Sequence, residues 1–68
     1  MSLRVGVVGC GYLGATTAVC LSSMGHHVTA TDVDAARVQA LNEGRTPFFE
    51  PGLADLLATQ LASGRLKF

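Results

Sequence analysis

The sequence predicts an α/β fold in which a small parallel sheet is connected by right-handed helical crossovers. Short β-branched runs alternate along the chain with segments whose apolar residues have helical spacing, and this alternation is typical of parallel strands. Glycines stand where the expected helices should end. Apolar residues form 49% of the chain and charged residues 15%, so the composition fits a packed domain and excludes a chain disordered by its charge.

Three segments have the character of strands. Residues 3–9 form a β-branched run that ends in glycine, which predicts a first strand buried on both faces. Residues 27–32 predict a second strand. Residues 65–68 predict the opening of a third strand.

Two helices are expected between and after the first two strands. Residues 12–24 suit a helix that ends at Gly25 in a left-handed conformation. Asp34 is the expected N-cap of a helix through Asn42, which Gly44 ends. The residues expected to face inward from these two helices are Gly14, Ala18, Leu21, Val38 and Leu41.

A third helix is expected after a proline-bracketed loop at residues 45–51. Pro51 suits the first turn of a helix, where a backbone N–H would have no intrahelical partner. Gly64 is the expected end of this helix. Its expected core stripe consists of Leu53, Leu56, Leu57 and Leu61.

The most informative motif is Gly9-Cys10-Gly11-Tyr12-Leu13-Gly14, a G-x-G-x-x-G run between the first strand and the first helix. In such a turn Gly9 permits the tight exit from the strand, and Gly11 lets a pyrophosphate approach the backbone. Gly14 lets the helix pack close to the strand. The pyrophosphate would lie at the helix N-terminus, where N–H groups and the helix dipole favour an anion.

An acidic residue at the end of the second strand strengthens this interpretation. Asp32 follows the glycine turn by about 20 residues, as the dinucleotide-binding fingerprint requires. Its carboxylate would accept hydrogen bonds from the adenosine ribose and repel a 2′-phosphate, which predicts NAD rather than NADP as cofactor. The alternative is a purely structural turn beside a solvated aspartate.

Other segments belong to a more specific pattern. Residues 25–29 read Gly-His-His-Val-Thr and lead into Thr-Asp-Val-Asp at 31–34, while residues 47–53 read Pro-Phe-Phe-Glu-Pro-Gly-Leu. With the glycine turn, Arg37 and residues 40–42, they make the chain resemble the nucleotide-sugar dehydrogenases of the UDP-glucose/GDP-mannose 6-dehydrogenase type. The resemblance covers the whole chain, and residues 47–53 are its most specific part.

The resemblance implies an NAD-dependent, four-electron oxidation of a sugar C6 alcohol to a carboxylate, such as UDP-glucose to UDP-glucuronate with two NAD. It implies that residues 9–14 wrap the pyrophosphate, that Asp32 holds the adenosine ribose and that Arg37 flanks the adenosine end. It places the nucleophilic cysteine in a later domain, so no catalytic residue is expected among these 68. A nucleotide-sugar substrate and a homo-oligomer are expected for the whole enzyme.

The expected architecture is therefore the N-terminal βαβα(α)β half of a Rossmann-type parallel sheet, with strand order 3-2-1 and helices on both faces. Residues 1–68 would be the N-terminal portion of the NAD-binding domain, with the substrate and C-terminal domains absent. A fourth strand would pair beside the first. Without it, we expect the isolated chain to be marginally stable or to self-associate through that edge.

Two other functions stay open. One is a free-standing NAD-responsive binding module without catalysis. The other is an NAD dehydrogenase of the 3-hydroxyacyl-CoA type, which shares the glycine turn but lacks the loop at residues 47–53.

The thiols and imidazoles receive structural interpretations. Cys10 lies at a variable position of the turn with no base near it in sequence, so catalysis is not expected. Cys20 is expected to be a small buried apolar residue. His26 and His27 could be a metal pair, but adjacent strand residues point to opposite sides, which favours a strand entry with one exposed histidine. No metal site is expected.

Three further side chains have two interpretations each. Tyr12 covers the nicotinamide side of the turn or packs at the helix start. Glu50 lines the cleft near the substrate or caps the next helix. Arg37 contacts the cofactor or is a solvated cation on a helix surface.

The charge balance and the apolar runs exclude several partners. Five basic residues balance five acidic ones, which argues against nucleic acid and against an anionic membrane surface. No apolar run approaches the roughly 20 residues that span a bilayer. Cys10 and Cys20 form neither a disulfide framework nor a zinc motif, which predicts a reducing, cytoplasmic location.

Overall fold

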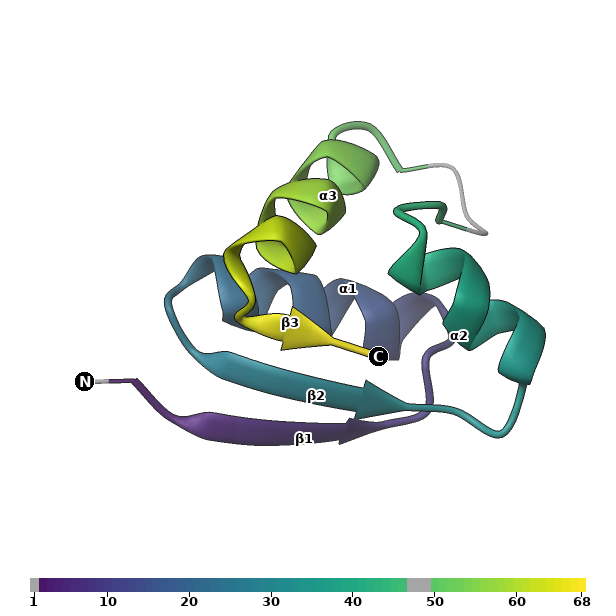
Figure 1. Ribbon diagram of the computed structural model, residues 1–68, viewed down its shortest axis with the longest axis horizontal. Helices are drawn as coiled ribbons and strands as arrows, with labels where there is room; N and C mark the ends of the chain where they lie inside the picture. Colours follow the sequence, from purple (N-terminus) through teal and green to yellow (C-terminus); the bar gives the residue numbers. More distant parts are fainter. Residues whose placement is uncertain (1, 47–49) are drawn as a thin grey trace.

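The computed structural model describes residues 2–46 and 50–68, and it has the predicted alternation of strands and helices (Figure 1). The α/β prediction is confirmed. The elements in chain order are β1 (Arg4–Val8), α1 (Tyr12–Ser23), β2 (His27–Thr31), α2 (Ala35–Asn42), α3 (Leu53–Ser63) and β3 (Leu66–Lys67).

The three strands form one parallel sheet in the order β1-β2-β3. Read from the other edge this is the predicted order 3-2-1, so the prediction is confirmed. Arg4 pairs with His27, and Thr29 pairs with Lys67. β1 lies at one edge of the sheet, as expected.

The helices cover one face of this sheet, and the prediction of helices on both faces is wrong for the described chain. Figure 1 shows α1 and α3 on the same side of the strands, with α2 beyond their carboxyl ends. In β2, Val28 and Ala30 are buried, whereas His27, Thr29 and Thr31 are exposed. Successive right-handed crossovers that step in one direction across a sheet leave their helices on one face, which explains the arrangement.

The prediction that the first strand is buried on both faces is wrong for the same reason. Exposed and half-buried residues alternate along β1, because every second side chain points to the uncovered face. The residues that form the buried core are Cys10, Ala15, Ala18, Val19, Val28, Ala30, Leu41, Leu53, Leu57 and Leu66.

The helix ends follow the glycines. Gly25, Gly44 and Gly64 have positive φ values of 98°, 82° and 81° at the ends of α1, α2 and α3, as predicted. Asp34 caps α2, since its Oδ1 accepts a hydrogen bond of 3.1 Å from the N–H of Arg37.

Three details of the predicted helices are wrong. Pro51 lies ahead of α3 rather than in its first turn, because Gly52 is the N-cap. Leu56 is 43% exposed, whereas Leu53 and Leu57 of the same stripe are buried. Cys20 is exposed on α1, because α1 buries a narrow stripe of small residues on the other side of the helix.

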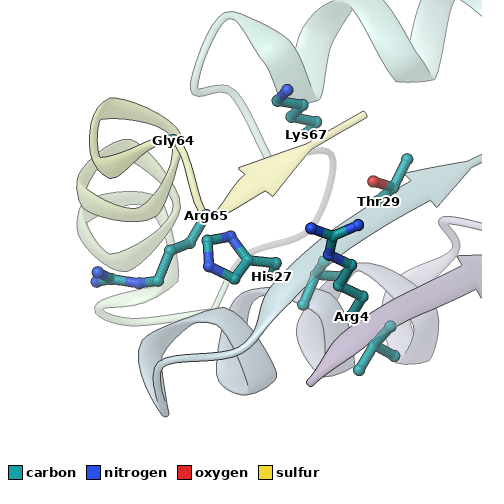
Figure 2. Close-up of a pocket in the computed structure, with 8 residues that line it drawn as sticks. Arg4, His27, Thr29, Gly64, Arg65 and Lys67 are labelled. Atoms are coloured by element: carbon teal, nitrogen blue, oxygen red, sulfur yellow. The ribbon is translucent and has the colours of Figure 1, made fainter. Parts of the chain in front are cut away.

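The uncovered face of the sheet carries a basic hollow of about 350 Å³ near the amino ends of the strands. Figure 2 shows Arg4, His27 and Lys67 around it, while the side chain of Arg65 points away. Arg65 instead donates hydrogen bonds to the carbonyl oxygen of Ser22 and to Oε1 of Gln60. Ligands of open α/β sheets bind at the carboxyl ends of the strands, so this hollow is at the wrong end for the predicted cofactor.

Within residues 2–46 and 50–68, no helix has both the length and the apolar character needed to cross a bilayer.

Candidate cofactor-binding site

The carboxyl ends of β1 and β2 carry a second hollow, of about 410 Å³. Its lining residues come from the ends of the two strands and the residues directly after them: Val8, Gly9, Thr31, Asp32 and Val33. Val8 and Val33 are almost fully exposed, which leaves apolar surface beside a carboxylate. The glycine turn and Asp32, which are distant in the sequence, therefore meet at the carboxyl ends of β1 and β2.

The outer glycines of the turn are required by the backbone itself. Gly9 has a φ of 93°, a conformation that L side chains rarely adopt, and its N–H donates to the carbonyl oxygen of Thr31 at 2.8 Å. A Cβ added at Gly14 would collide with the carbonyl oxygen of Gly9. The predicted roles of these two glycines in the tight turn and the close helix packing are confirmed.

Gly11 differs from both of them. Its φ of −65° suits any residue, and a Cβ added there would meet no described atom within 4 Å. Packing among residues 2–46 and 50–68 therefore does not require a glycine at this position. Within that part of the chain, a glycine here leaves open space directly beside the N-terminus of α1.

The N-terminus of α1 differs from that of α2 in having no side-chain cap among the described residues. Gly11 is its N-cap, and in the described part of the chain no side chain caps it and no acidic residue stands in its first turn. The first N–H groups of an α-helix have no intrahelical acceptor, and together with the helix dipole they favour an anion. The space at Gly11 and a helix end without a described side-chain cap fit the pyrophosphate of a dinucleotide.

Asp32 connects the turn that follows β1 to the turn that follows β2. Its Oδ2 accepts from the N–H of Cys10 at 2.7 Å, and its Oδ1 accepts from the N–H of Asp34 at 2.8 Å. These two donors, with a smaller contribution from Arg37, hold the pKa of the Asp32 carboxyl below its ordinary value. The side chain is an ionised acceptor with lone pairs still available for hydroxyl donors.

Arg37 lies beside this carboxylate. Its Nη1 is 3.6 Å from Oδ2 of Asp32, and its side chain is 37% exposed. Asp34 caps α2, so Arg37 lies in the first turn of that helix, with its guanidinium beside the carboxylate that lines the hollow. The structure thus brings together the glycine turn, Asp32 and Arg37.

The comparison with protein families agrees with this geometry. Residues 3–68 match the family described as the UDP-glucose/GDP-mannose dehydrogenase family, NAD binding domain. The chain belongs to this family. It accordingly carries an NAD-binding fold of nucleotide-sugar dehydrogenases.

Curated members of the family are similar over almost the whole chain. The chain is 46% identical over 66 residues to the UDP-glucose 6-dehydrogenase YwqF of Bacillus subtilis, and this match covers 97% of the chain. It is 45% identical over 65 residues to the GDP-mannose 6-dehydrogenase of Azotobacter vinelandii, with 96% covered. The chain spans 15% of the length of each of these relatives.

Solved structures of the family share the fold. A UDP-glucose dehydrogenase from the archaeon Pyrobaculum islandicum matches with a TM-score of 0.95 at 40% identity, over 100% of this chain and 16% of the other. A GDP-mannose dehydrogenase from Pseudomonas aeruginosa, solved as a ternary complex, matches with a TM-score of 0.86 at 40% identity, over 98% and 15%.

Cys10 is part of the buried core of this chain. It is buried, and its thiol donates to the carbonyl oxygen of Thr31 at 3.3 Å. Burial, and secondarily the charge of Asp32, raises the pKa of the thiol against the opposing effect of Arg37. A thiol kept protonated is a poor nucleophile, which supports the prediction that Cys10 is not catalytic.

The histidines do not form a pair. Nδ1 of His26 accepts from the N–H of Leu3 at 3.1 Å, whereas His27 is exposed on the uncovered face of β2. Among the described residues, no group of three or more His, Cys, Asp or Glu is arranged to hold a metal ion.

Sequence reasoning missed one contact at the site. The hydroxyl of Tyr12 donates to Oε2 of Glu50 at 2.8 Å, across 38 positions of the sequence. Glu50 does not cap α3 through its side chain, so the capping interpretation is wrong. The two residues were already singled out in separate motifs, but nothing in the sequence pairs them. The remainder of the specific loop, residues 47–49, lies outside the described residues.

Proposed function

We propose that this chain binds NAD at the carboxyl ends of β1 and β2. The observation that carries the proposal is the juxtaposition of an uncapped helix N-terminus with an ionised Asp32 at one edge of the sheet. The residues proposed to contact the cofactor are Gly9, Cys10, Gly11, Tyr12, Leu13, Gly14, Asp32 and Arg37.

The pyrophosphate is proposed to lie against the N-terminus of α1. The space beside Gly11 admits it, and backbone N–H groups supply the hydrogen bonds without a lysine. Leu13 is 77% exposed in this first turn, so its apolar side chain is available to contact the cofactor. Cys10 takes part through its backbone, since its side chain is buried behind the turn.

The adenosine ribose is proposed to lie on Asp32. Two N–H donors already fix the orientation of this carboxylate, so little ordering is needed when it accepts the ribose hydroxyls. A 2′-phosphate would meet its negative charge, which favours NAD over NADP. Arg37 is held against Asp32 and flanks the adenosine end.

We further propose that the chain is the N-terminal portion of a nucleotide-sugar 6-dehydrogenase that oxidises UDP-glucose to UDP-glucuronate. Bound NAD supplies the hydride acceptor for each of the two oxidation steps. The catalytic residues and most of the sugar-nucleotide site would belong to the rest of the protein. A UDP-glucose enzyme and a GDP-mannose enzyme are both among the relatives, and the activity of the full-length protein distinguishes these two substrates.

Calorimetric titration with NAD and with NADP tests the site, with circular dichroism on the same samples to verify folding. We expect saturable NAD binding, weaker NADP binding, and a loss of roughly ten- to a hundredfold in NAD affinity for Asp32→Ala, the range for charge-assisted hydrogen bonds. Asp55→Ala, which changes an acidic residue in the first turn of α3, is the matched control. Unchanged affinity in Asp32→Ala would remove Asp32 from the site.

Activity of the full-length protein tests the substrate. We expect NAD reduction with UDP-glucose and two NADH formed for each sugar oxidised. Reduction with GDP-mannose alone would keep the enzyme class and correct the substrate. NAD binding without reduction in the presence of either sugar nucleotide would favour the non-catalytic binding module.

A further inference from the structure

We infer that Glu50 is a positioning residue for the cofactor site, which it serves by anchoring the ring of Tyr12 beside the glycine turn. The inference rests on the proposed binding of NAD at that turn. Neither the family match nor the names of the relatives assigns a role to this contact.

The first step is the place of Tyr12. It is the first residue of α1 and directly follows Gly11, so its backbone belongs to the helix end that faces the proposed pyrophosphate. It is 50% exposed, and its ring is attached to the residue directly beside Gly11. A ring at this position either stays aside or obstructs the approach to the helix end.

The second step is the rigidity of Glu50. Its carbonyl oxygen accepts from the N–H of Leu53 at 3.1 Å, and Gly52 has a φ of 82°. This is the pattern of a type II turn, with Pro51 and Gly52 at its two central positions. The turn leads directly into α3, where Leu53 is buried in the core. The backbone of Glu50 is therefore fixed by the packing of α3, although its side chain is exposed.

The third step is what the hydrogen bond prevents. A carboxylate is itself a favoured partner for a helix N-terminus, so a loose Glu50 near α1 would compete with an anion for the same N–H groups. The bond of 2.8 Å holds this carboxylate at the far tip of the Tyr12 ring. The same bond ties the phenolic end of the ring to the turn that leads into α3, and this tie limits the positions that the ring can take beside Gly11.

The phenol makes this contact dependent on pH. The hydrogen bond to Glu50, and then the negative charge of that carboxylate, raise the pKa of Tyr12 above its ordinary value. Loss of the phenolic proton would break the bond and place two negative charges together. NAD affinity should therefore fall at alkaline pH as Tyr12 ionises, and this fall should be absent in Tyr12→Phe.

The test is a double-mutant cycle on NAD affinity in the full-length protein. We expect Tyr12→Phe and Glu50→Ala each to weaken NAD binding about three- to tenfold, and the double variant to be no weaker than either single one. Glu50→Gln should retain near-normal affinity, because an amide oxygen still accepts from the phenol while its charge no longer competes. Glu43→Gln, which changes an exposed carboxylate at the C-terminal end of α2, is the matched control.

Three results would overturn the inference: unchanged affinity in Glu50→Ala, additive losses in the double variant, or an alkaline fall in affinity that persists in Tyr12→Phe. Failure of the proposed function looks different, because the unsubstituted protein would then not bind NAD. All substitutions are at exposed side chains, and circular dichroism of each variant verifies folding. Glu50→Gln keeps the hydrogen bond and so provides a folded comparison.

Discussion

The two strand-to-helix turns at the carboxyl edge of the sheet are built in opposite ways. In the β2–α2 turn, the Asp34 side chain accepts from the N–H of Arg37 and caps the helix. In the β1–α1 turn, Gly11 stands at the same position, and no described side chain caps the helix. One helix end is capped by a side chain of its own chain, while the other is the proposed site of the pyrophosphate. Under this proposal, neighbouring turns of one fold are specialised, one for stability and one for binding.

Asp32 couples these two turns. Its two carboxylate oxygens divide between the N–H of Cys10 in the first turn and the N–H of Asp34 in the second. The residue proposed to hold the ribose is thus also the residue that fixes the relative position of the two helix starts. Binding and stability can be separated by substitutions that affect only one of the turns.

The largest expected effect is on the packing of the first turn. Gly14→Ala should lower the free energy of unfolding by about 3 kcal/mol or more, because the new methyl group meets the backbone carbonyl of Gly9, which cannot move aside cheaply. Gly6→Ala is the matched control, since a Cβ there meets no described atom within 4 Å. Urea unfolding followed by circular dichroism measures both. Equal stability of the two variants would contradict the close approach of α1 to β1.

The next largest effect is expected from a substitution that gives the β1–α1 turn an acidic cap like that of the β2–α2 turn. Gly11→Asp should place a carboxylate over the N–H groups of α1 and reduce NAD affinity by about a hundredfold or more, because it occupies and repels the pyrophosphate. The free energy of unfolding should rise by only a few tenths of a kcal/mol, the usual difference between glycine and a capping side chain. Calorimetric titration and urea unfolding separate the two quantities. NAD affinity that survives this substitution would place the pyrophosphate elsewhere.

A pH-dependent effect should follow from Asp32. Its pKa is lowered in the folded state, so its contribution to stability is present above the pKa of the unfolded chain and is lost as the pH falls through the folded value. Asp32→Asn should therefore be destabilising near neutral pH, and its difference from the unsubstituted chain should shrink in acid. Unfolding curves over a series of pH values give this difference. A constant difference at all pH values would indicate that the charge of Asp32 does not hold the two turns together.

The smallest expected effect is on the second turn alone. Asp34→Ala should cost about 1 kcal/mol of unfolding free energy through the lost cap of α2. Asp34→Ser should retain most of the unfolding free energy that Asp34→Ala loses, because a hydroxyl also accepts from the helix N–H groups. NAD affinity should be nearly unchanged in Asp34→Ser. A large loss of affinity there would show that the β2–α2 turn also takes part in binding.

The local features of this protein were predictable because they depend on near neighbours in the sequence. Asp34 was identifiable as a cap and Gly25, Gly44 and Gly64 as helix ends, since capping and left-handed geometry are decided within one turn of chain. The roles of Gly9 and Gly14 were predictable for the same reason. The motif fixes a backbone path in which only glycine fits at both positions.

The features that the sequence did not predict depend on how the helices and strands pack on one another. Which face of the sheet is covered depends on the direction of successive crossovers, and this left every second residue of β1 exposed where burial on both faces was expected. Cys20 is exposed because α1 buries the stripe of residues on its other side. The bond between Tyr12 and Glu50 exists because α3 packs on α1 and brings a loop against a helix start 38 positions away. The sequence by itself determined the turns and the chemistry placed on them. Only tertiary packing decided which of those groups meet, because contacts between distant residues depend on the path of the whole chain.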